Sequence, residues 1–258
     1  MAISRRHPAA LLAVMVVGLA STGVAYAAVT SSTKPVAVAK SATQIEQGKQ
    51  LFLEGCSSCH GLAAQGTSDA PSLIGVGAAA VDFQVGTGRM PLAGPGIQAM
   101  RKPPVYTPEQ TAALAAYVAS LGSGPAIPTK EMTSTSNADL ALGGELFRTN
   151  CAQCHSVSGK GGALSWGRYA PNLMGSDAKT IYEAMITGPQ SMPVFNDKTL
   201  TVKEKQDIIR YIQELQKEQS PGGYSLGRLG PVTEGLFMWI AGLGALLVVA
   251  VWIGAKAK

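Results

Sequence analysis

LFLEGCSSCH (residues 51–60) and LFRTNCAQCH (residues 146–155) are two copies of one pattern, and this repetition decides the fold that we expect. Each copy contains a Leu-Phe pair, two cysteines separated by two residues, and a histidine directly after the second cysteine. The chain has four cysteines, and all of them lie in the two copies: Cys56, Cys59, Cys151 and Cys154. It has three histidines, and His60 and His155 end the copies. Because almost all cysteines and histidines lie in these two copies, we infer that both copies form the same kind of site.

Three kinds of site compete for the two Cys-x-x-Cys-His motifs. A disulfide suits an exported protein but does not explain the histidine that follows each pair. A zinc site needs four ligands, whereas the two pairs lie in separate repeats that each look complete. A thioredoxin-like pair needs a βαβ context, which the sequence lacks. C-x-x-C-H is the attachment signature of c-type haem, in which both thiols bond to the macrocycle and the histidine ligates the iron. We therefore expect two covalently bound c-type haems, with His60 and His155 as axial ligands.

Methionine is the expected second axial ligand of each iron. The third histidine, His7, lies in the N-terminal leader, so no histidine remains for this position. Met90 and Met192 each follow a glycine-containing turn and directly precede a proline, which restricts the preceding residue to extended geometry. Methionine ligation raises the reduction potential of a haem. The rival methionines without this context are Met100 for the first site and Met174 or Met185 for the second.

A proline follows each motif at a corresponding place in the repeat. A haem-ligating histidine normally donates its other N–H to a carbonyl or carboxylate, which fixes the orientation of the ring. The carbonyls of Pro71 and Pro171 are the candidates for this role. The other reading of both prolines is that they only form turns.

Each repeat closes with a pattern that predicts a helix. Residues 107–122 have Thr107 as the candidate N-cap, Pro108 in the first turn and Gly122 past the end. Residues 201–216 have Thr201 as the candidate cap and apolar residues at helical spacing. Glycines also precede both motifs, as Gly48-Lys-Gln-Leu-Phe and Gly144-Glu-Leu-Phe.

Both ends of the chain contain apolar segments. Residues 1–28 have Arg5-Arg6, an apolar stretch and Ala25-Tyr26-Ala27, which is typical of a cleaved secretory signal; an uncleaved anchor is the alternative. Residues 235–254 are uncharged and long enough to cross a bilayer. Lys256 and Lys258 follow and are expected to stay cytoplasmic, so the middle of the chain is exported.

The charge balance argues against nucleic acid as a partner. The formal net charge is +5, but four of the basic residues lie in the leader and the tail. The remainder has 17 basic and 16 acidic residues and no Lys/Arg run interleaved with aromatics.

These observations divide the chain into eight segments. The expected segments are a signal peptide or N-terminal anchor (1–28), a linker (29–43), a first haem domain (44–122), a linker (123–139), a second haem domain (140–217), a juxtamembrane linker (218–234), a transmembrane helix (235–254) and a cytoplasmic tail (255–258).

The tandem arrangement of CSSCH with GRMP and CAQCH with QSMP, followed by LGRLGPVTEGLFMWI, resembles one family. It is the di-haem cytochrome c subunit of the actinobacterial cytochrome bcc complex, a menaquinol–cytochrome c reductase. The resemblance implies an all-α fold of two class I cytochrome c domains plus a C-terminal transmembrane helix in the plasma membrane. It implies a cytochrome b subunit, a Rieske iron–sulfur subunit and a haem–copper oxidase as partners, with electrons passing from the Rieske cluster through both haems to the oxidase.

The chain carries no catalytic apparatus of its own: the sequence offers no spare cysteine, distal histidine or phosphate-binding loop. We therefore expect it to be the electron-transfer subunit of a proton-translocating quinol–cytochrome c oxidoreductase, with no catalytic residue. Two other functions stay open, a freestanding membrane-tethered di-haem shuttle and a haem-based redox or gas sensor.

Overall fold

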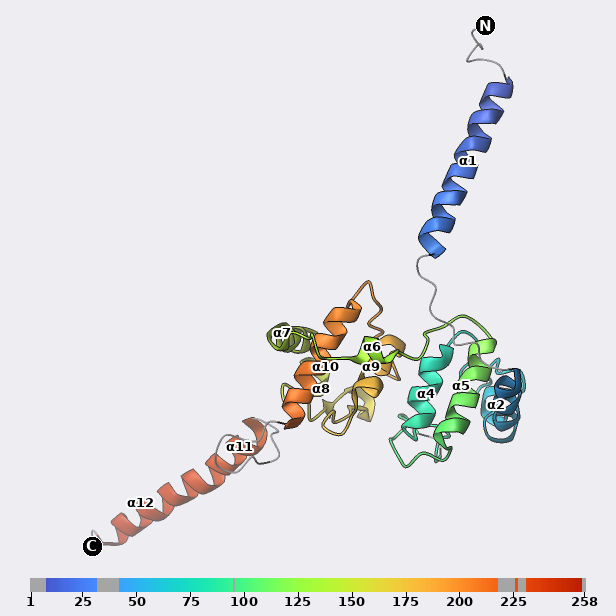
Figure 1. Cartoon of the computed structure of the whole chain (residues 1–258). Helices are drawn as coiled ribbons and strands as arrows, with labels where there is room; N and C mark the ends of the chain where they lie inside the picture. The colour runs from blue at the N-terminus through green and yellow to red at the C-terminus, as the bar shows by residue number, and fades with distance from the viewer. Residues whose placement is uncertain (1–7, 32–41, 95, 218–225, 227–230, 257–258) are drawn as a thin grey trace. The chain divides into compact units, whose positions relative to one another are not determined.

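The computed structural model describes residues 8–31, 42–94, 96–217, 226 and 231–256 (Figure 1). The expected positive residues Arg5 and Arg6, His7 and most of the two outer linkers lie outside the described residues. The chain divides into two compact units, residues 1–42 and 43–258, which are described separately. The first unit contains one helix, α1 (Pro8–Ser31), whose apolar part is Leu12–Val24. This helix runs through the expected Ala-x-Ala cleavage site.

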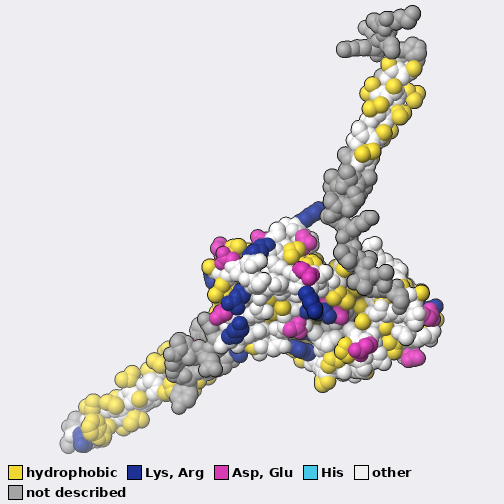
Figure 2. Space-filling model, in the orientation of Figure 1, with side chains coloured by type: hydrophobic (Ala, Val, Ile, Leu, Met, Phe, Trp, Pro, Cys, Tyr) yellow, Lys and Arg dark blue, Asp and Glu magenta, His cyan; other side chains and the backbone are white. Residues whose placement is uncertain are grey.

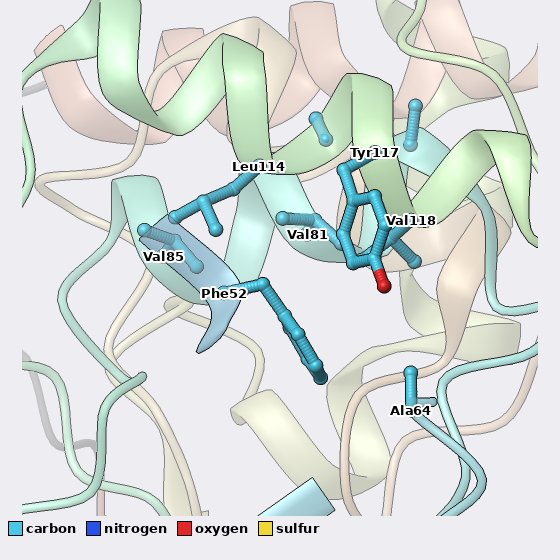
Figure 3. Close-up of a cluster of buried hydrophobic side chains, with 9 residues drawn as sticks. Phe52, Ala64, Val81, Val85, Leu114, Tyr117 and Val118 are labelled. Atoms are coloured by element: carbon cyan, nitrogen blue, oxygen red, sulfur yellow. The ribbon is translucent and has the colours of Figure 1, made fainter. Parts of the chain in front are cut away.

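The first domain consists of α2 (Ala42–Gly55), α3 (Ser57–His60), α4 (Gly77–Gly86) and α5 (Pro108–Ser120). Helices α4 and α5 pack along each other (Figure 1), and α2 crosses α5. Figure 3 shows the core between them, in which Phe52 lies beside Tyr117 with ring centroids 5.3 Å apart. The other labelled members of this core are Ala64, Val81, Val85, Leu114 and Val118.

The second domain repeats this arrangement with α7 (Leu140–Asn150), α8 (Ala152–His155), α9 (Ala178–Thr187) and α10 (Val202–Lys217). Phe147 takes the place of Phe52 and packs at 5.3 Å against Tyr211. A two-residue antiparallel pair, β1 (Gly162–Ala163) with β2 (Tyr169–Ala170), and a short 3-10 turn, η1 (Ser165–Gly167), lie between α8 and α9. The all-α class with two cytochrome-like domains is confirmed, with this small ribbon as the one sheet among the described residues.

Both closing helices begin as the sequence predicts. Thr107 caps α5 through a hydrogen bond from Gln110 N, and the Gln110 side chain accepts a bond from Thr107 N in return. Thr201 and Glu204 form the same reciprocal capping box before α10. Such boxes satisfy backbone donors that a helix N-terminus leaves unpaired, so each helix has a defined first residue.

The expected linker 123–139 packs on both domains. Ala79 N donates to Pro125 O at 3.1 Å in the first domain. Further along, α6 (Lys130–Thr133) lies against α10, where Gln206 Nε2 donates to Glu131 O at 2.7 Å. The glycine- and proline-rich composition of this segment gave no sign of these contacts, because they depend on partners far away in the sequence.

The C-terminal helix extends beyond the residues expected to span the membrane. It comprises α11 (Pro231–Phe237), a π-helical stretch η3 (Met238–Leu243) and α12 (Gly244–Lys256). Among the described residues, Val232–Lys256 is the one helix of 25 residues that is apolar enough to cross a bilayer. Its side chains are almost all hydrophobic, whereas the two domains expose both acidic and basic groups (Figure 2). The helix includes Lys256, the first of the two lysines expected in the tail, and residues 257–258 lie outside the described part.

Candidate haem sites

Each Cys-x-x-Cys-His motif forms a tight turn at the end of a helix. In the first domain, Cys56 N donates to Phe52 O at 2.8 Å and His60 N donates to Cys56 O at 2.9 Å. In the second, Cys151 N donates to Phe147 O and His155 N to Cys151 O at the same two distances. The motif therefore starts directly after its core helix ends, at Gly55 or Asn150, and makes one further helical turn, α3 or α8, that ends at the histidine.

The two histidine rings are held in the same way. His60 Nδ1 lies 2.8 Å from Pro71 O, and His155 Nδ1 lies 2.9 Å from Pro171 O. A carbonyl oxygen only accepts, so Nδ1 carries the hydrogen in both rings and the lone pair of Nε2 is free for a metal. The predicted role of the two proline carbonyls is thus confirmed.

The burial of His155 keeps its imidazole neutral. Burial lowers the pKa of His155, and the hydrogen bond to the Pro171 carbonyl opposes this only in part. A neutral imidazole is the form that binds iron.

The cysteines do not have the properties of a redox-active pair. All four cysteines, each of which the structure describes, have free sulfurs. Burial raises the pKa of Cys56, and it raises the pKa of Cys151 to about 12, with the second cysteine of each motif adding to the effect. A catalytic Cys-x-x-Cys has a lowered pKa, because the thiolate is its nucleophile. The structure therefore argues against a thioredoxin-like centre and shows no disulfide at either motif.

A lysine that the sequence did not single out holds the loop that contains Met90. The Nζ atom of Lys102 donates to Gly88 O and to Pro91 O, the carbonyls on either side of Met90. Gly88 has φ +73°, and a Cβ there would overlap the carbonyl oxygen of Lys102. Met90 itself packs against the first core, as does Cys56. The rival Met100 is 54% exposed, and its sulfur accepts a hydrogen bond from Tyr169 Oη at 3.1 Å.

A cavity that is partly open to solvent lies at the second motif. Its wall includes Cys151, Cys154 and His155 on one side and Met192 on the loop after α9. Met185 also lines the cavity and is 2% exposed, whereas Met174 is not among the lining residues. Two thioethers thus reach the cavity, and the Met-Pro context of Met192 is what favours it as the ligand.

The residues present fit a covalently attached haem. The cavity brings together two thiols, an imidazole with a free Nε2 and a thioether, which are the donors that hold c-type haem. The remaining wall is largely apolar, with Leu173, Ile181, Ile208 and Ile212 among its residues. Such a wall suits a flat hydrophobic macrocycle and shields it from water.

A loop of the first domain, residues 96–101, docks beside this cavity; we term it the docking loop. The Gln98 side chain donates to Tyr169 O at 2.7 Å and accepts from Tyr169 N at 3.0 Å. Conversely, the Gln190 side chain accepts from Ala99 N at 2.9 Å and donates to Ala99 O at 3.1 Å. In each domain, one glutamine side chain therefore forms two hydrogen bonds with the backbone of the other domain. The glutamine of the second domain, Gln190, lies two residues before Met192.

The domains also meet through helices α4 and α9. Lys179 of α9 forms an ion pair with Asp82 of α4, and its Nζ lies 3.9 Å from Glu183 Oε1. Glu183 is 1% exposed. Its pKa is raised to about 9, first by burial and then by the neighbouring carboxylate of Asp82. Lys179 lowers this pKa only in part, because its Nζ lies closer to Asp82 than to Glu183.

Comparisons with known proteins agree with this architecture. The family model for cytochrome c matches residues 45–122, and the model for subunit III of cbb3-type cytochrome c oxidase matches residues 138–212. A cytochrome bc1 complex cytochrome c subunit from Corynebacterium efficiens is 46% identical over 98% of this chain and 90% of its own length. Subunits of the same name from Mycobacterium leprae and Mycobacterium tuberculosis are 48% identical, over 90% and 89% of this chain and 83% and 85% of their own lengths. From this similarity and the duplicated motif turns, the chain belongs to the family of cytochrome c subunits of the cytochrome bc1 complex.

Proposed function

We propose that this chain is a membrane-anchored di-haem c-type cytochrome. It carries single electrons from the Rieske iron–sulfur subunit of a menaquinol–cytochrome c reductase to a haem–copper oxidase. The observation that supports it most is the duplicated site: in both domains a histidine with a free Nε2 ends a turn that presents two free thiols.

The residues divide into three roles at each proposed site. Cys56 and Cys59, and in the second domain Cys151 and Cys154, attach the cofactor. His60 and His155 supply the imidazole ligand, and Met90 and Met192 supply the thioether ligand. When bound, a haem of this kind supplies reversible one-electron chemistry at high potential.

The protein's contribution is to hold the two sites in one body. The paired glutamine contacts and the Lys179–Asp82 ion pair join the domains directly. A second carrier fixed in this way makes a diffusing cytochrome c unnecessary between the reductase and its oxidase, because its effective concentration is set by the chain itself.

The proposed location follows from the C-terminal helix and the family. Val232–Lys256 anchors the chain, and the positive-inside rule places Lys256 and Lys258 in the cytoplasm. The haem domains then lie on the extracytoplasmic side. The cytochrome b and Rieske subunits are the neighbours that membership of a bc1-type complex implies.

Purification of the tagged full chain in mild detergent tests the proposal. We expect two haems per chain by pyridine haemochrome assay, with cytochrome b, Rieske and oxidase subunits copurifying in stoichiometric amounts. A Cys151→Ser/Cys154→Ser variant should retain one haem. Two haems without these partners would instead indicate a freestanding shuttle, and fewer than two would contradict the di-haem assignment.

A further inference from the structure

Arg89, the residue directly before Met90, is a buried cation. It is 8% exposed. Its Nη1 donates to Thr87 Oγ1 at 2.6 Å, and its guanidinium carbon lies 4.6 Å from the centroid of the Phe83 ring. Both contacts are with uncharged groups of its own domain.

No ion pair among the described residues includes Arg89 or Arg101. A guanidinium withdrawn from water needs a counter-charge, because the loss of hydration is costly and a neutral partner recovers only part of it. The arrangement is therefore that of a site prepared for an anion.

The position of Arg89 indicates which anion would pair with it. Although it belongs to the first domain, Arg89 lines the cavity that contains Cys151, Cys154 and His155. Arg101 and Gln98 of the docking loop line the same cavity. The glutamine contacts described above fix this loop there.

We propose that the first domain completes the second haem site, with Arg89 and Arg101 pairing with the propionate carboxylates of the haem bound at Cys151 and Cys154. This inference rests on the proposed function. The thiols, imidazole and thioether of this cavity fit a haem, and the negative groups of a haem are its propionates. Bidentate guanidinium–carboxylate pairs are also the strongest of the charge-assisted hydrogen bonds.

One short segment would then serve both sites. Met90 packs toward the first core, whereas its neighbour Arg89 reaches the second cavity. The thioether ligand of one iron and the cation beside the other haem are consecutive residues.

The test is a redox titration of the full chain in detergent, carrying Arg89→Gln. A cation beside a haem destabilises the more positive ferric state, so its removal should lower the potential of the second haem. We expect a shift of up to about tenfold in the one-electron equilibrium constant, about 59 mV. The first haem should change less. Met90→His and Met192→His assign the two components, because exchange of methionine for histidine lowers the potential of the haem it ligates.

Three further variants make the result decisive. Arg148→Gln removes an exposed positive charge of the second domain that does not line the cavity, and it should leave both potentials unchanged. Arg89→Lys keeps the positive charge. The potential of its second haem should therefore stay close to that of the unaltered chain. If Arg89→Gln reduces haem content, Arg101→Gln replaces it, because the Arg101 side chain is exposed and can be exchanged without disturbing the core.

Two outcomes overturn the inference while leaving the proposed function intact. One is a chain with two haems in which neither arginine exchange moves the second component. The other is a shift confined to the first component. Loss of haem from the unaltered chain, or no response to Met192→His, would instead contradict the proposed function.

Discussion

At the scale of single residues, the orientation of two imidazole rings determines the chemistry. Each ring is tied through Nδ1 to a proline carbonyl that lies after a glycine with positive φ, Gly66 in one repeat and Gly161 in the other. A Cβ at either glycine would overlap the backbone next to that proline. The glycine therefore lets the loop fold back closely enough for its carbonyl to reach the ring.

An experiment can distinguish which of the two thioethers at the second cavity, Met192 or Met185, ligates the iron. Met192→Leu should open the sixth position of the second iron, so that the ferrous protein gains carbon monoxide binding at about one haem in two. Met185→Leu is the matched control, because it removes a thioether from the same cavity and should leave binding near the wild-type level. A carbon monoxide difference spectrum measures both, and the opposite ranking would make Met185 the ligand.

At the scale of elements, two helix crossings depend on glycine. A Cβ at Gly48 of α2 would overlap Ala113 O of α5, and a Cβ at Gly143 of α7 would overlap Asp207 O of α10. Counted back from the first cysteine of each motif, these two glycines are equivalent. Gly144, the glycine nearest Leu-Phe in the second repeat, lies one position later, and a Cβ there would meet the ring of Tyr211.

Gly143→Ala should destabilise the second domain by about 1–3 kcal/mol, the usual cost of inserting a methyl group into a filled contact. The two helices must separate, because the obstacle is backbone and cannot change rotamer. Gly175→Ala is the control: the position has open space and a backbone that alanine adopts. Chemical denaturation of the full chain in detergent measures the difference, and equal stabilities for the two variants would contradict the crossing.

At the scale of the whole molecule, a carboxyl group is buried where the two domains meet. Glu183 is buried beside Asp82 and Lys179, with Asp177 at the start of the same helix. Its Oε1 has no hydrogen-bond partner among the described residues. Burial and the two neighbouring carboxylates favour the protonated form, against the single opposing charge of Lys179.

This raised pKa makes stability depend on pH. The pKa of Glu183 rises from 4.5 to about 9 on folding, so the folded chain holds a proton that the unfolded chain releases above pH 4.5. The stability that the protonated group contributes is complete at low pH and is lost as the pH rises toward 9. Each pKa unit corresponds to about 1.4 kcal/mol.

Glu183→Gln should therefore flatten the pH dependence and be more stable than the wild type at pH 8, by roughly 1–3 kcal/mol after allowance for the neighbouring charges. Thermal unfolding of the full chain at pH 5 and pH 8 measures this. Glu145→Gln, at an exposed position of α7, should behave like the wild type. Parallel pH profiles for Glu183→Gln and the wild type would show that the carboxyl is ionised in the folded chain.

Residue spacing alone determined the two motif turns, the proline carbonyls at the histidines, the caps of α5 and α10 and the apolar C-terminal helix, because each depends on groups close together in the sequence. The ligand roles of Met90 and Met192 stay predictions, as do the segment boundaries. Only the tertiary structure revealed Lys102 at the Met90 loop, the glutamine contacts between domains, the buried Glu183 and the place of Arg89. The contacts of Lys102, of the paired glutamines and of Lys179 with Asp82 join residues 11 to 97 positions apart, and spacing within one repeat does not specify which distant residues meet. The repeat thus encodes two similar domains, whereas the packing of one domain on the other makes their sites unequal.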